Sequence, residues 1–327
     1  MKNKNHLICF LPLACLLFAV GCNNQSETSP VSVNTNSTHV ISLITKLTNT
    51  VYWQAVFAGA KEAGKDYGYD ITWGGSDRET NCTPQIELVN QAIAAKVSGV
   101  LLSPVDRTGL VDSVNKLADM NIPCVIIDSG LDAVRFLSIA STDNYEGGAM
   151  AARCLGNAMG GKGKVLVVRH ISGSHAAAKR VSGFVATLAA EFPGITIVES
   201  ESGQDRSEIA RQVTEGMLQR HPDAQGLFAC NVDVSVGALE ALQEMGRTDV
   251  KMVAFDPAKS LIDGLKSGQV VAMIVQDPYK MGYDGVQVLA LHCKGQSSPR
   301  VIDTGVEAVT MKNITDPAIM RLLGEQQ

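Results

Sequence analysis

Two short apolar runs, Gly99-Val-Leu-Leu-Ser103 and Cys124-Val-Ile-Ile-Asp128, flank a stretch with helical periodicity over residues 110–120. A strand–helix–strand succession of this kind is typical of a parallel sheet, and near-continuous apolar strands indicate that helices cover both faces. The same alternation extends toward the N-terminus, with strands expected at 40–45 and 71–73 and helices at 51–66 and 85–95. This part of the chain therefore predicts an α/β fold.

The second half of the chain repeats this pattern. Strands are expected at 165–168, 196–199, 227–230 and 252–255, again separated by helical segments. Gly99 and Asp128 are 29 residues apart, and Gly226 and Asp256 are 30 apart, so an aspartate follows the fourth strand of each half. We expect two doubly wound, Rossmann-like parallel-sheet lobes, because a single core stops growing near this chain length.

Composition excludes several classes of protein. The chain has 327 residues, of which 45% are hydrophobic, which is enough for packed cores and argues against wholesale disorder. Its formal charge is −5, without a basic stripe, so we expect no nucleic-acid partner. Beyond residue 22 the five cysteines are widely spaced and form no CxxC pair, so we expect mostly free thiols and no structural zinc site. The six histidines show no metal-ligand spacing, and we expect neither a metal nor a cofactor.

The N-terminus indicates export. A charged start is followed by an apolar run over residues 7–20 and then by Gly21-Cys22. A run of about 14 residues is too short to span a bilayer, which needs about 20. Leu17-Phe-Ala-Val-Gly-Cys22 resembles a bacterial lipobox, with Ala19 where leucine is commoner; an ordinary signal peptide cut nearby is the alternative. We expect 1–22 to be a lipoprotein signal with lipidated Cys22, and the Asn/Ser/Thr-rich 23–38 to be a flexible tether.

Single polar side chains stand where the expected strands end. In parallel α/β sheets, ligands bind beyond the carboxyl ends of the strands. Capping of the following helix explains any one Asp or Asn in such a place, but a set divided between two lobes is better explained by a polar cleft. The candidates of this kind are Lys46, Asp128, Arg169, His170, Asn231, Asp256 and Gln276.

Two aromatic residues, Tyr52 and Trp53, follow the first expected strand. Flat rings suit the C–H face of a sugar, while carboxylates and amides bind its hydroxyls. The alternative is that these rings begin a helix and pack into the lobe.

Several motifs together give the chain a family resemblance from Val40 to about Asn313. The motifs are Ile122-Pro-Cys-Val-Ile-Ile-Asp128, Arg180-Val-Ser-Gly-Phe184, Phe228-Ala-Cys-Asn231 with Gly237-Ala-Leu239, and Val253-Ala-Phe-Asp256. The body resembles the sugar-binding proteins of bacterial ABC importers, specifically the ribose/galactose-type periplasmic binding proteins with the type I fold. Lys46 resembles the lysine found after the first strand in the rhamnose- and autoinducer-type branch.

The resemblance implies a three-crossing hinge near Ser141, Asp277 and Gly305. The lobes would then be 39–141 plus 277–305 and 142–276 plus 306–327. It also implies that Asp128, Asn231, Asp256 and Gln276 bind hydroxyls, and that Tyr52 and Trp53 take the places of two phenylalanines. Ser129 stands where ribose binders have an arginine, and Ala178 stands where they have another, so ribose itself is doubtful. Ser129 is nevertheless counted among the expected ligand-binding residues, and Arg169, His170 and Arg180 are further candidates for ligand contacts.

We therefore expect a monomeric, non-enzymatic, extracytoplasmic solute-binding lipoprotein of an ABC importer, binding a monosaccharide or polyol-like ligand and meeting a membrane permease. Two alternatives stay open: a ligand-sensing partner of a membrane kinase, and a binder of a non-sugar polar metabolite. An enzyme would need a nucleophile–base pair. Ser174-His175 is a poor candidate because adjacent residues rarely aim at one point and no Gly-x-Ser-x-Gly elbow surrounds them.

Overall fold

The computed structural model describes residues 39–324. The signal expected at 1–22, the lipidation site Cys22 and the tether expected at 23–38 all lie outside the described residues. Within 39–324, no helix is both long and apolar enough to cross a membrane.

The first lobe is built on a six-stranded sheet in the order β11-β5-β4-β3-β1-β2, and every pair in it is parallel. We call this the N-terminal lobe. Its strands are β1 (Val40–Thr45), β2 (Asp70–Gly75), β3 (Gly99–Leu102), β4 (Cys124–Ile127), β5 (Ser138–Ser141) and β11 (Val301–Asp303). Its helices are α1 (Val51–Tyr67), α2 (Thr83–Ala94), α3 (Val111–Asp119) and α9 (Pro278–Cys293).

The second lobe, the C-terminal lobe, has a six-stranded sheet in the order β12-β10-β9-β8-β6-β7. Its strands are β6 (Lys162–Arg169), β7 (Gly194–Ser202), β8 (Gly226–Ala229), β9 (Lys251–Phe255), β10 (Val270–Gln276) and β12 (Val306–Val309). Its helices are α4 (Asn144–Ala158), α5 (His175–Glu191), α6 (Ser207–Arg220), α7 (Val232–Glu244), α8 (Lys259–Ser267) and α10 (Pro317–Leu322). The edge strand β12 runs antiparallel to β10, a departure from a wholly parallel sheet.

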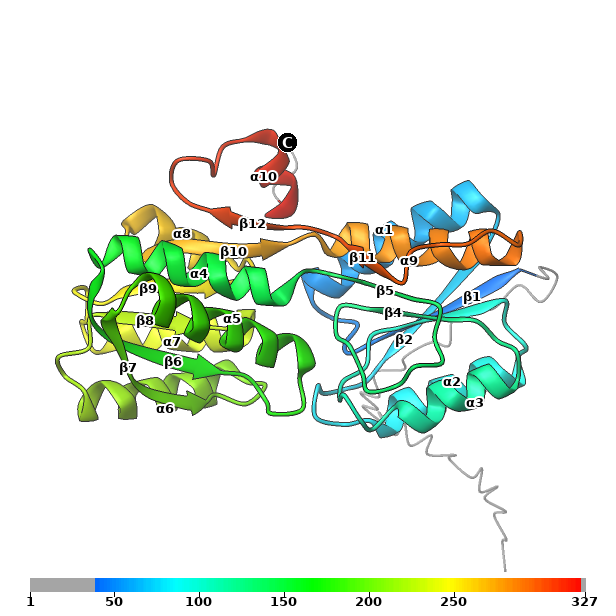
Figure 1. Cartoon of the computed structure of the whole chain (residues 1–327), viewed down its shortest axis with the longest axis horizontal. Coiled ribbons are helices and arrows are strands. Elements are labelled where there is room, and N and C mark those ends of the chain that lie inside the picture. The colour runs from blue at the N-terminus through cyan, green and yellow to red at the C-terminus, as the bar shows by residue number, and fades with distance from the viewer. Residues whose placement is uncertain (1–38, 325–327) are drawn as a thin grey trace, which may run out of the picture. The chain divides into compact units, whose positions relative to one another are not determined.

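Alternation along the buried strands explains the layers of the N-terminal lobe. On one face of the sheet, Leu43 and Leu101 pack with residues of α1 and α9. On the other face, Ile44 and Leu102 pack with residues of α2 and α3. Successive strand side chains point to opposite faces, so a strand that is apolar throughout needs helices on both sides, as Figure 1 shows.

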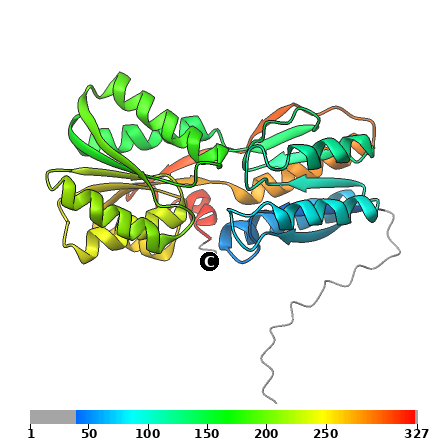
Figure 2. The same ribbon diagram turned by 90° about the horizontal axis from the view of Figure 1, so that it is seen from below.

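The chain passes between the two sheets three times: from β5 to α4, from β10 to α9 and from β11 to β12 (Figures 1 and 2). Two of these crossings are hydrogen-bonded to each other. The amide of Thr304 donates to the carbonyl of Ser141, and the hydroxyl of Thr142 donates to the carbonyl of Gly305 at 3.2 Å. Strands β5, β11 and β12, which border these crossings, are short and were not anticipated from periodicity.

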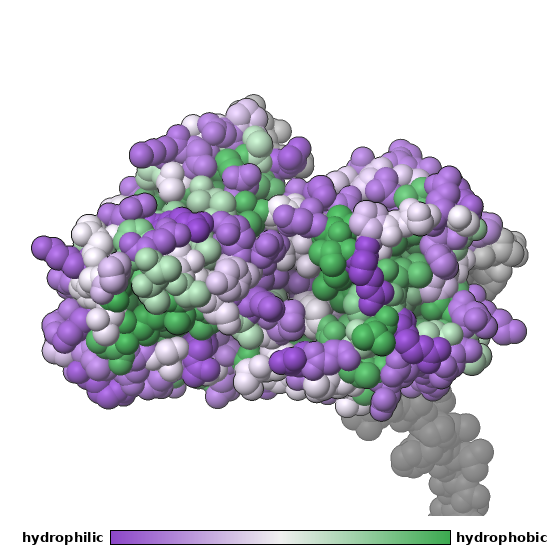
Figure 3. All heavy atoms as spheres, viewed as in Figure 1, coloured by the Kyte–Doolittle hydropathy of each residue, from purple (hydrophilic) through white to green (hydrophobic). Residues whose placement is uncertain are grey.

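Outside the cores the face drawn in Figure 3 is mainly hydrophilic, with apolar patches scattered between polar side chains. The five cysteines of the described residues are free thiols, as expected from their spacing.

Candidate functional site

A cavity lies between the two lobes, and both contribute side chains to its wall. The N-terminal lobe supplies residues that follow β1, β2 and β4. The C-terminal lobe supplies residues that follow β6, β8 and β9, together with Gln276, the last residue of β10. These are the carboxyl ends of the strands, where the fold brings loops and helix N-termini together. Of the residues predicted from the sequence, the cavity wall contains Lys46, Tyr52, Trp53, Asp128, His170, Arg180, Asn231, Asp256 and Gln276.

A buried ion pair forms the N-terminal side of the cavity. Lys46 Nζ lies 2.8 Å from Asp128 Oδ2 and also donates to Ser129 Oγ at 2.9 Å. Asp128 accepts two further hydrogen bonds, from Ser103 Oγ at 3.0 Å and from the Tyr52 hydroxyl at 3.1 Å. The Lys46 ammonium and the hydroxyls of Ser103 and Tyr52 therefore hold this carboxylate in a defined orientation.

The pair stays charged despite its burial. Burial alone would lower the pKa of Lys46, but attraction to Asp128 and to Glu79 outweighs it and raises that pKa. Burial alone would raise the pKa of Asp128, but the Lys46 ammonium and its hydrogen bond hold it below its usual value. A charged donor and a charged acceptor therefore face the cavity together, which suits recognition of a polar ligand.

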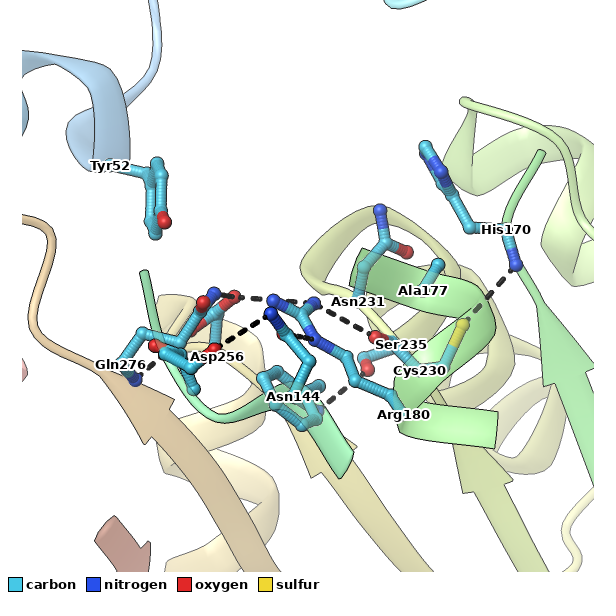
Figure 4. Close-up of polar contacts among 12 residues, drawn as sticks. Tyr52, Asn144, His170, Ala177, Arg180, Cys230, Asn231, Ser235, Asp256 and Gln276 are labelled. Atoms are coloured by element: carbon cyan, nitrogen blue, oxygen red, sulfur yellow. Dashed lines mark hydrogen bonds and ion pairs between the residues drawn. The ribbon is translucent and has the colours of Figure 1, made fainter. Parts of the chain in front are cut away.

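A second charged group, centred on Arg180 in α5, forms the opposite side (Figure 4). Its Nε donates to Asn144 Oδ1 at 2.8 Å, its Nη1 donates to the carbonyl of Cys230 at 3.0 Å, and its guanidinium lies over the Phe255 ring, 3.8 Å from the centroid. Asp256 Oδ2 is 4.0 Å from Nη1 of this arginine. The guanidinium is thus fixed by hydrogen bonds and ring contact, and the ion pair itself is long.

Asp256 is also bonded to the end of β10. Gln276 Nε2 donates to Asp256 Oδ2 at 2.7 Å, which leaves Gln276 Oε1 buried without a hydrogen-bond partner. Burial raises the pKa of Asp256, and the opposing effects of Arg180 and Gln276 are too weak to cancel it. Because Gln276 Oε1 has no partner among the described residues, it is an acceptor available to a ligand.

Asp128 and Asp256 are not helix caps. Their φ angles are 61° and 64°, in the left-handed region that Asp and Asn tolerate better than most residues, and each follows its strand directly. Asn231, by contrast, does cap α7, since its side chain accepts from the amide of Val234 at 3.2 Å. Asn231 also lines the cavity, so capping and a place in the cleft are compatible for this residue.

Tyr52 and Trp53 both line the cavity and also belong to the lobe. Their rings meet edge to face with centroids 4.9 Å apart. Trp53 is only 3% exposed and packs with the core beside α1 and α9. Trp53 thus fits both interpretations from the sequence, since its ring lines the cavity and also packs in the core of the lobe.

Two of the predicted residues, Arg169 and Ser129, do not line the cavity. The Nη2 of Arg169 donates to the carbonyl of Ser200 at 3.4 Å in an exposed position. Ser129 is buried and touches the site through Lys46 rather than through the cavity wall. Ser174, set aside as a nucleophile, caps α5 by accepting from the amide of Ala177.

Two carboxylates in the cavity wall were missed in the sequence, Glu79 and Asp233. Burial raises the pKa of Glu79 to about 7 and that of Asp233 to about 6. Glu79 lies in the loop after β2, and Asp233 stands two residues past Asn231. Neither residue stands directly after a strand, where the predicted candidates lie, although both follow strand ends on the cavity side of their sheets.

His170 lines the cavity beside Glu79. Its Nε2 is 3.8 Å from Glu79 Oε2, and neither ring nitrogen has a hydrogen-bond partner. Burial, with Lys46 and Arg180 nearby, lowers the pKa of His170 to about 3, so the ring is neutral at physiological pH. A neutral imidazole in this place offers one donor and one acceptor.

Two α/β lobes, three chain crossings and a polar cavity at the strand ends define the class of two-lobed solute-binding proteins. The chain belongs to the periplasmic binding protein family, whose domain model matches residues 41–297.

Curated relatives cover most of the chain. The ribose import binding protein of Salmonella typhimurium is 28% identical over 284 residues, which are 87% of this chain and 93% of that protein. The D-apiose import binding protein of Paraburkholderia graminis is 28% identical over 239 residues, covering 73% of this chain and 76% of that one.

Solved structures give the same family. A carbohydrate transporter solute-binding protein from Agrobacterium radiobacter, in complex with D-arabinose, is 32% identical with a TM-score of 0.83, covering 87% of this chain and 98% of that one. An ABC transporter solute-binding protein from Agrobacterium vitis, bound with α-D-tagatopyranose, is 33% identical with a TM-score of 0.83, covering 87% and 99%.

Proposed function

We propose that this chain is the extracytoplasmic solute receptor of an ABC importer, and that it binds a monosaccharide or polyol between its two lobes. The observation that carries the proposal is the pairing of Lys46 with Asp128 on one side of the cavity and of Arg180 with Asp256 on the other. Charged groups already fixed by the protein bind hydroxyls without a large cost of reorganisation. The sugars named for the relatives support this ligand class.

Each lobe has its own part in binding. Asp128, Asp256, Asn231 and Gln276 accept or donate hydrogen bonds to hydroxyls, and Lys46, Arg180 and His170 provide further donors. Tyr52 and Trp53 contact the apolar side of the ring, and Ser129 holds the Lys46 ammonium in place. No reaction is assigned to these groups, and the protein acts as a binder.

The lobes, residues 39–141 plus 277–305 and residues 142–276 plus 306–327, close about the three crossings. A ligand that touches both sides of the cavity has more contacts in the closed form. Its differential affinity therefore shifts the population toward closure. The closed form is the one presented to a membrane permease.

The proposed location in the cell rests on the N-terminal sequence, in which Cys22 carries the lipid and residues 23–38 form the tether. We propose that the receptor works as a monomer on the outer side of the cytoplasmic membrane or in the periplasm.

Calorimetry with purified protein tests the binding function, using D-ribose, D-arabinose, D-tagatose, D-apiose and xylitol as probes, alongside mass spectrometry of co-purifying small molecules. We expect a sugar or polyol to bind, and Asp256→Asn to weaken its binding by roughly tenfold or more. Asparagine tolerates the φ of 64° at this position, so the variant should fold.

The matched control is Asp263→Asn, since Asp263 is a half-exposed carboxylate of α8 paired with Lys259 outside the cavity. It should leave the affinity unchanged. Failure to find any bound or binding sugar or polyol would count against the proposal.

A further inference from the structure

Glu79 and Asp233 line the cavity from opposite lobes and lack partners. Among residues 39–324, neither carboxylate accepts a hydrogen bond, and the basic nitrogen within 4.0 Å of Glu79 is His170 Nε2 at 3.8 Å. His170 is neutral, so this contact brings no positive charge. An unpaired carboxylate removed from water is costly unless something neutralises it.

The charges of the cleft do not balance. Its two cations, Lys46 and Arg180, face Asp128 and Asp256, with Lys46 bonded at 2.8 Å and Arg180 at 4.0 Å. At the rim, Arg78 of one lobe pairs with Asp205 of the other at 3.5 Å.

Within the described part of the chain, Glu79 and Asp233 are thus left without a positive partner, and ionising them in the cavity is unfavourable. Lys46 attracts Glu79, but this lysine is already paired with Asp128. The carboxylates of Asp128, Asp205 and Asp233 all repel that of Glu79.

Two further polar groups point to a ligand in the same cavity. His170 is 3% exposed and Gln276 is 2% exposed, yet both ring nitrogens of His170 and Oε1 of Gln276 are buried without partners. Buried polar atoms are nearly always hydrogen-bonded in a finished protein–ligand complex. The cleft therefore has unused donors and acceptors next to its unpaired carboxylates.

We infer that the ligand carries a protonated amine and is an amino sugar or amino polyol. The inference rests on the proposed function and narrows its ligand class. An ammonium brings one positive charge and up to three donors, and placed near Glu79 and Asp233 it neutralises charge from both lobes at once. A neutral sugar would donate hydrogen bonds but supply no positive charge to either carboxylate. Among residues 39–324, no group of three or more His, Cys, Asp or Glu could hold a metal ion in place of the amine.

An amine between the two carboxylates also favours closure. Glu79 belongs to the N-terminal lobe and Asp233 to the C-terminal lobe, so the full interaction exists only when the lobes are together. Without the cation, bringing the two carboxylates together is unfavourable.

The first experiment compares matched sugars by calorimetry at pH 6.0, where a sugar amine is protonated. The pairs are D-glucosamine with D-glucose, D-galactosamine with D-galactose and D-mannosamine with D-mannose, and the N-acetyl derivatives keep the nitrogen without its charge. We expect the best amino sugar to bind roughly tenfold or more tighter than its neutral and N-acetyl partners, as a charge-assisted contact predicts.

The second experiment removes one charge from the protein. Glu79→Gln keeps the shape of the side chain and should abolish most of the preference for the amine over its neutral partner. Glu87→Gln makes the same change on the exposed surface of α2 and should keep the preference. An unchanged preference in Glu79→Gln would overturn the inference.

Proton exchange gives a readout that does not depend on affinity alone. An ammonium stabilises the ionised carboxylates, so binding at pH 6.0 should release protons and affinity should rise as the pH increases toward 7. A neutral ligand deepens their burial, takes protons up and binds more weakly as the pH increases. Measuring the binding enthalpy in two buffers of different ionisation enthalpy separates these cases.

The outcomes distinguish the two proposals. A neutral sugar from either panel that binds as tightly as every amino sugar, or an amino sugar whose binding takes up protons instead of releasing them, overturns the inference and leaves the sugar-binding function standing. Absence of binding by all amino and neutral sugars overturns the sugar-binding function, and the inference falls with it.

Discussion

Asp128 and Asp256 hold equivalent positions in the two sheets, each with left-handed backbone directly after a strand, yet their surroundings differ. Asp128 has an ammonium at 2.8 Å, whereas the guanidinium nearest to Asp256 lies at 4.0 Å. Their pKa values consequently shift in opposite directions, that of Asp128 downward and that of Asp256 upward. The same residue type in the same place of the fold thus has a different electrostatic role.

The Lys46–Asp128 pair can be tested by a double-mutant cycle. Asp128→Asn and Lys46→Met should each lower the free energy of unfolding by about 3 kcal/mol, because each leaves the other group buried and unpaired. The double variant should lose less than the sum of the two, as measured by urea denaturation at pH 7. Asp132→Asn, which breaks an exposed pair with Arg107, is the control and should change little.

The same pair sets a pH dependence. Because the pKa of Asp128 is lowered by folding, its stabilisation is complete above the unfolded value of about 3.9 and is lost as the pH falls through the folded value. The difference in stability between the parent and Asp128→Asn should therefore narrow in acid. A difference that stays constant to pH 2 would contradict this account.

At the scale of elements, helix pairs cross at glycines in both lobes. A Cβ added to Gly282 in α9 would overlap the carbonyl of Val56 in α1, and one added to Gly59 would overlap the carbonyl of Tyr279. In the C-terminal lobe, Gly148 of α4 and Gly183 of α5 have the same relation to the carbonyls of Arg180 and Tyr145. The backbones touch at these crossings, which positions α1 and α5, the helices that carry Trp53 and Arg180.

Gly282→Ala should therefore destabilise the protein by about 2 kcal/mol, since the added methyl group forces α1 and α9 apart. Gly216→Ala is a matched control in α6, where the added atom would meet only the flexible Arg220 side chain, its Nη1 at 3.1 Å. The control should be neutral or up to about 1 kcal/mol more stable. Thermal unfolding checks both, and an equal effect of the two substitutions would refute the helix-contact explanation.

At the scale of the whole molecule, the contacts between lobes at the rim influence closure. Arg78 reaches Asp205 of the other lobe at 3.5 Å, with the Arg78 side chain 48% exposed. The Asp205 side chain is only 6% exposed, but the contact is long and the guanidinium is in water, so the pair contributes up to about 1 kcal/mol and Arg78→Ala should weaken ligand binding by no more than about fivefold. The effect should shrink in high salt and appear in the dissociation rate. Unchanged affinity at low salt would show that the pair has no part in closure.

Membrane attachment concerns the whole molecule as well, and it rests on residues outside the described range. Cys22→Ser should give an unlipidated protein that leaves the membrane fraction while binding ligand normally. Cell fractionation and intact mass measurement check the outcome, with Cys293→Ser as a control for loss of an exposed thiol. Retention of Cys22→Ser in the membrane would disprove the lipid anchor.

The sequence by itself determined the alternation of strands and helices, the two lobes and most of the strand-end residues of the cavity. These features follow from local patterns: buried strands are apolar throughout, and a polar residue such as Asp128 or Gln276 stands where a strand leaves the core. Arg169 and His170 show the limit, because they are adjacent in the chain, yet only His170 lines the cavity. Side chains alternate along extended backbone, and the sequence does not say which of two neighbours faces inward.

Only the tertiary structure decided the charge balance of the cleft. Glu79 and Asp233 lie more than 150 residues apart in the sequence, the first in the loop after β2 and the second in the first turn of α7 in the other lobe, and neither belongs to a recognisable motif. Their burial, the absence of partners for them among residues 39–324 and their raised pKa values arise when the two lobes meet across the cavity. Electrostatic free energy depends on distances through space and on exclusion of water, and local sequence patterns specify neither.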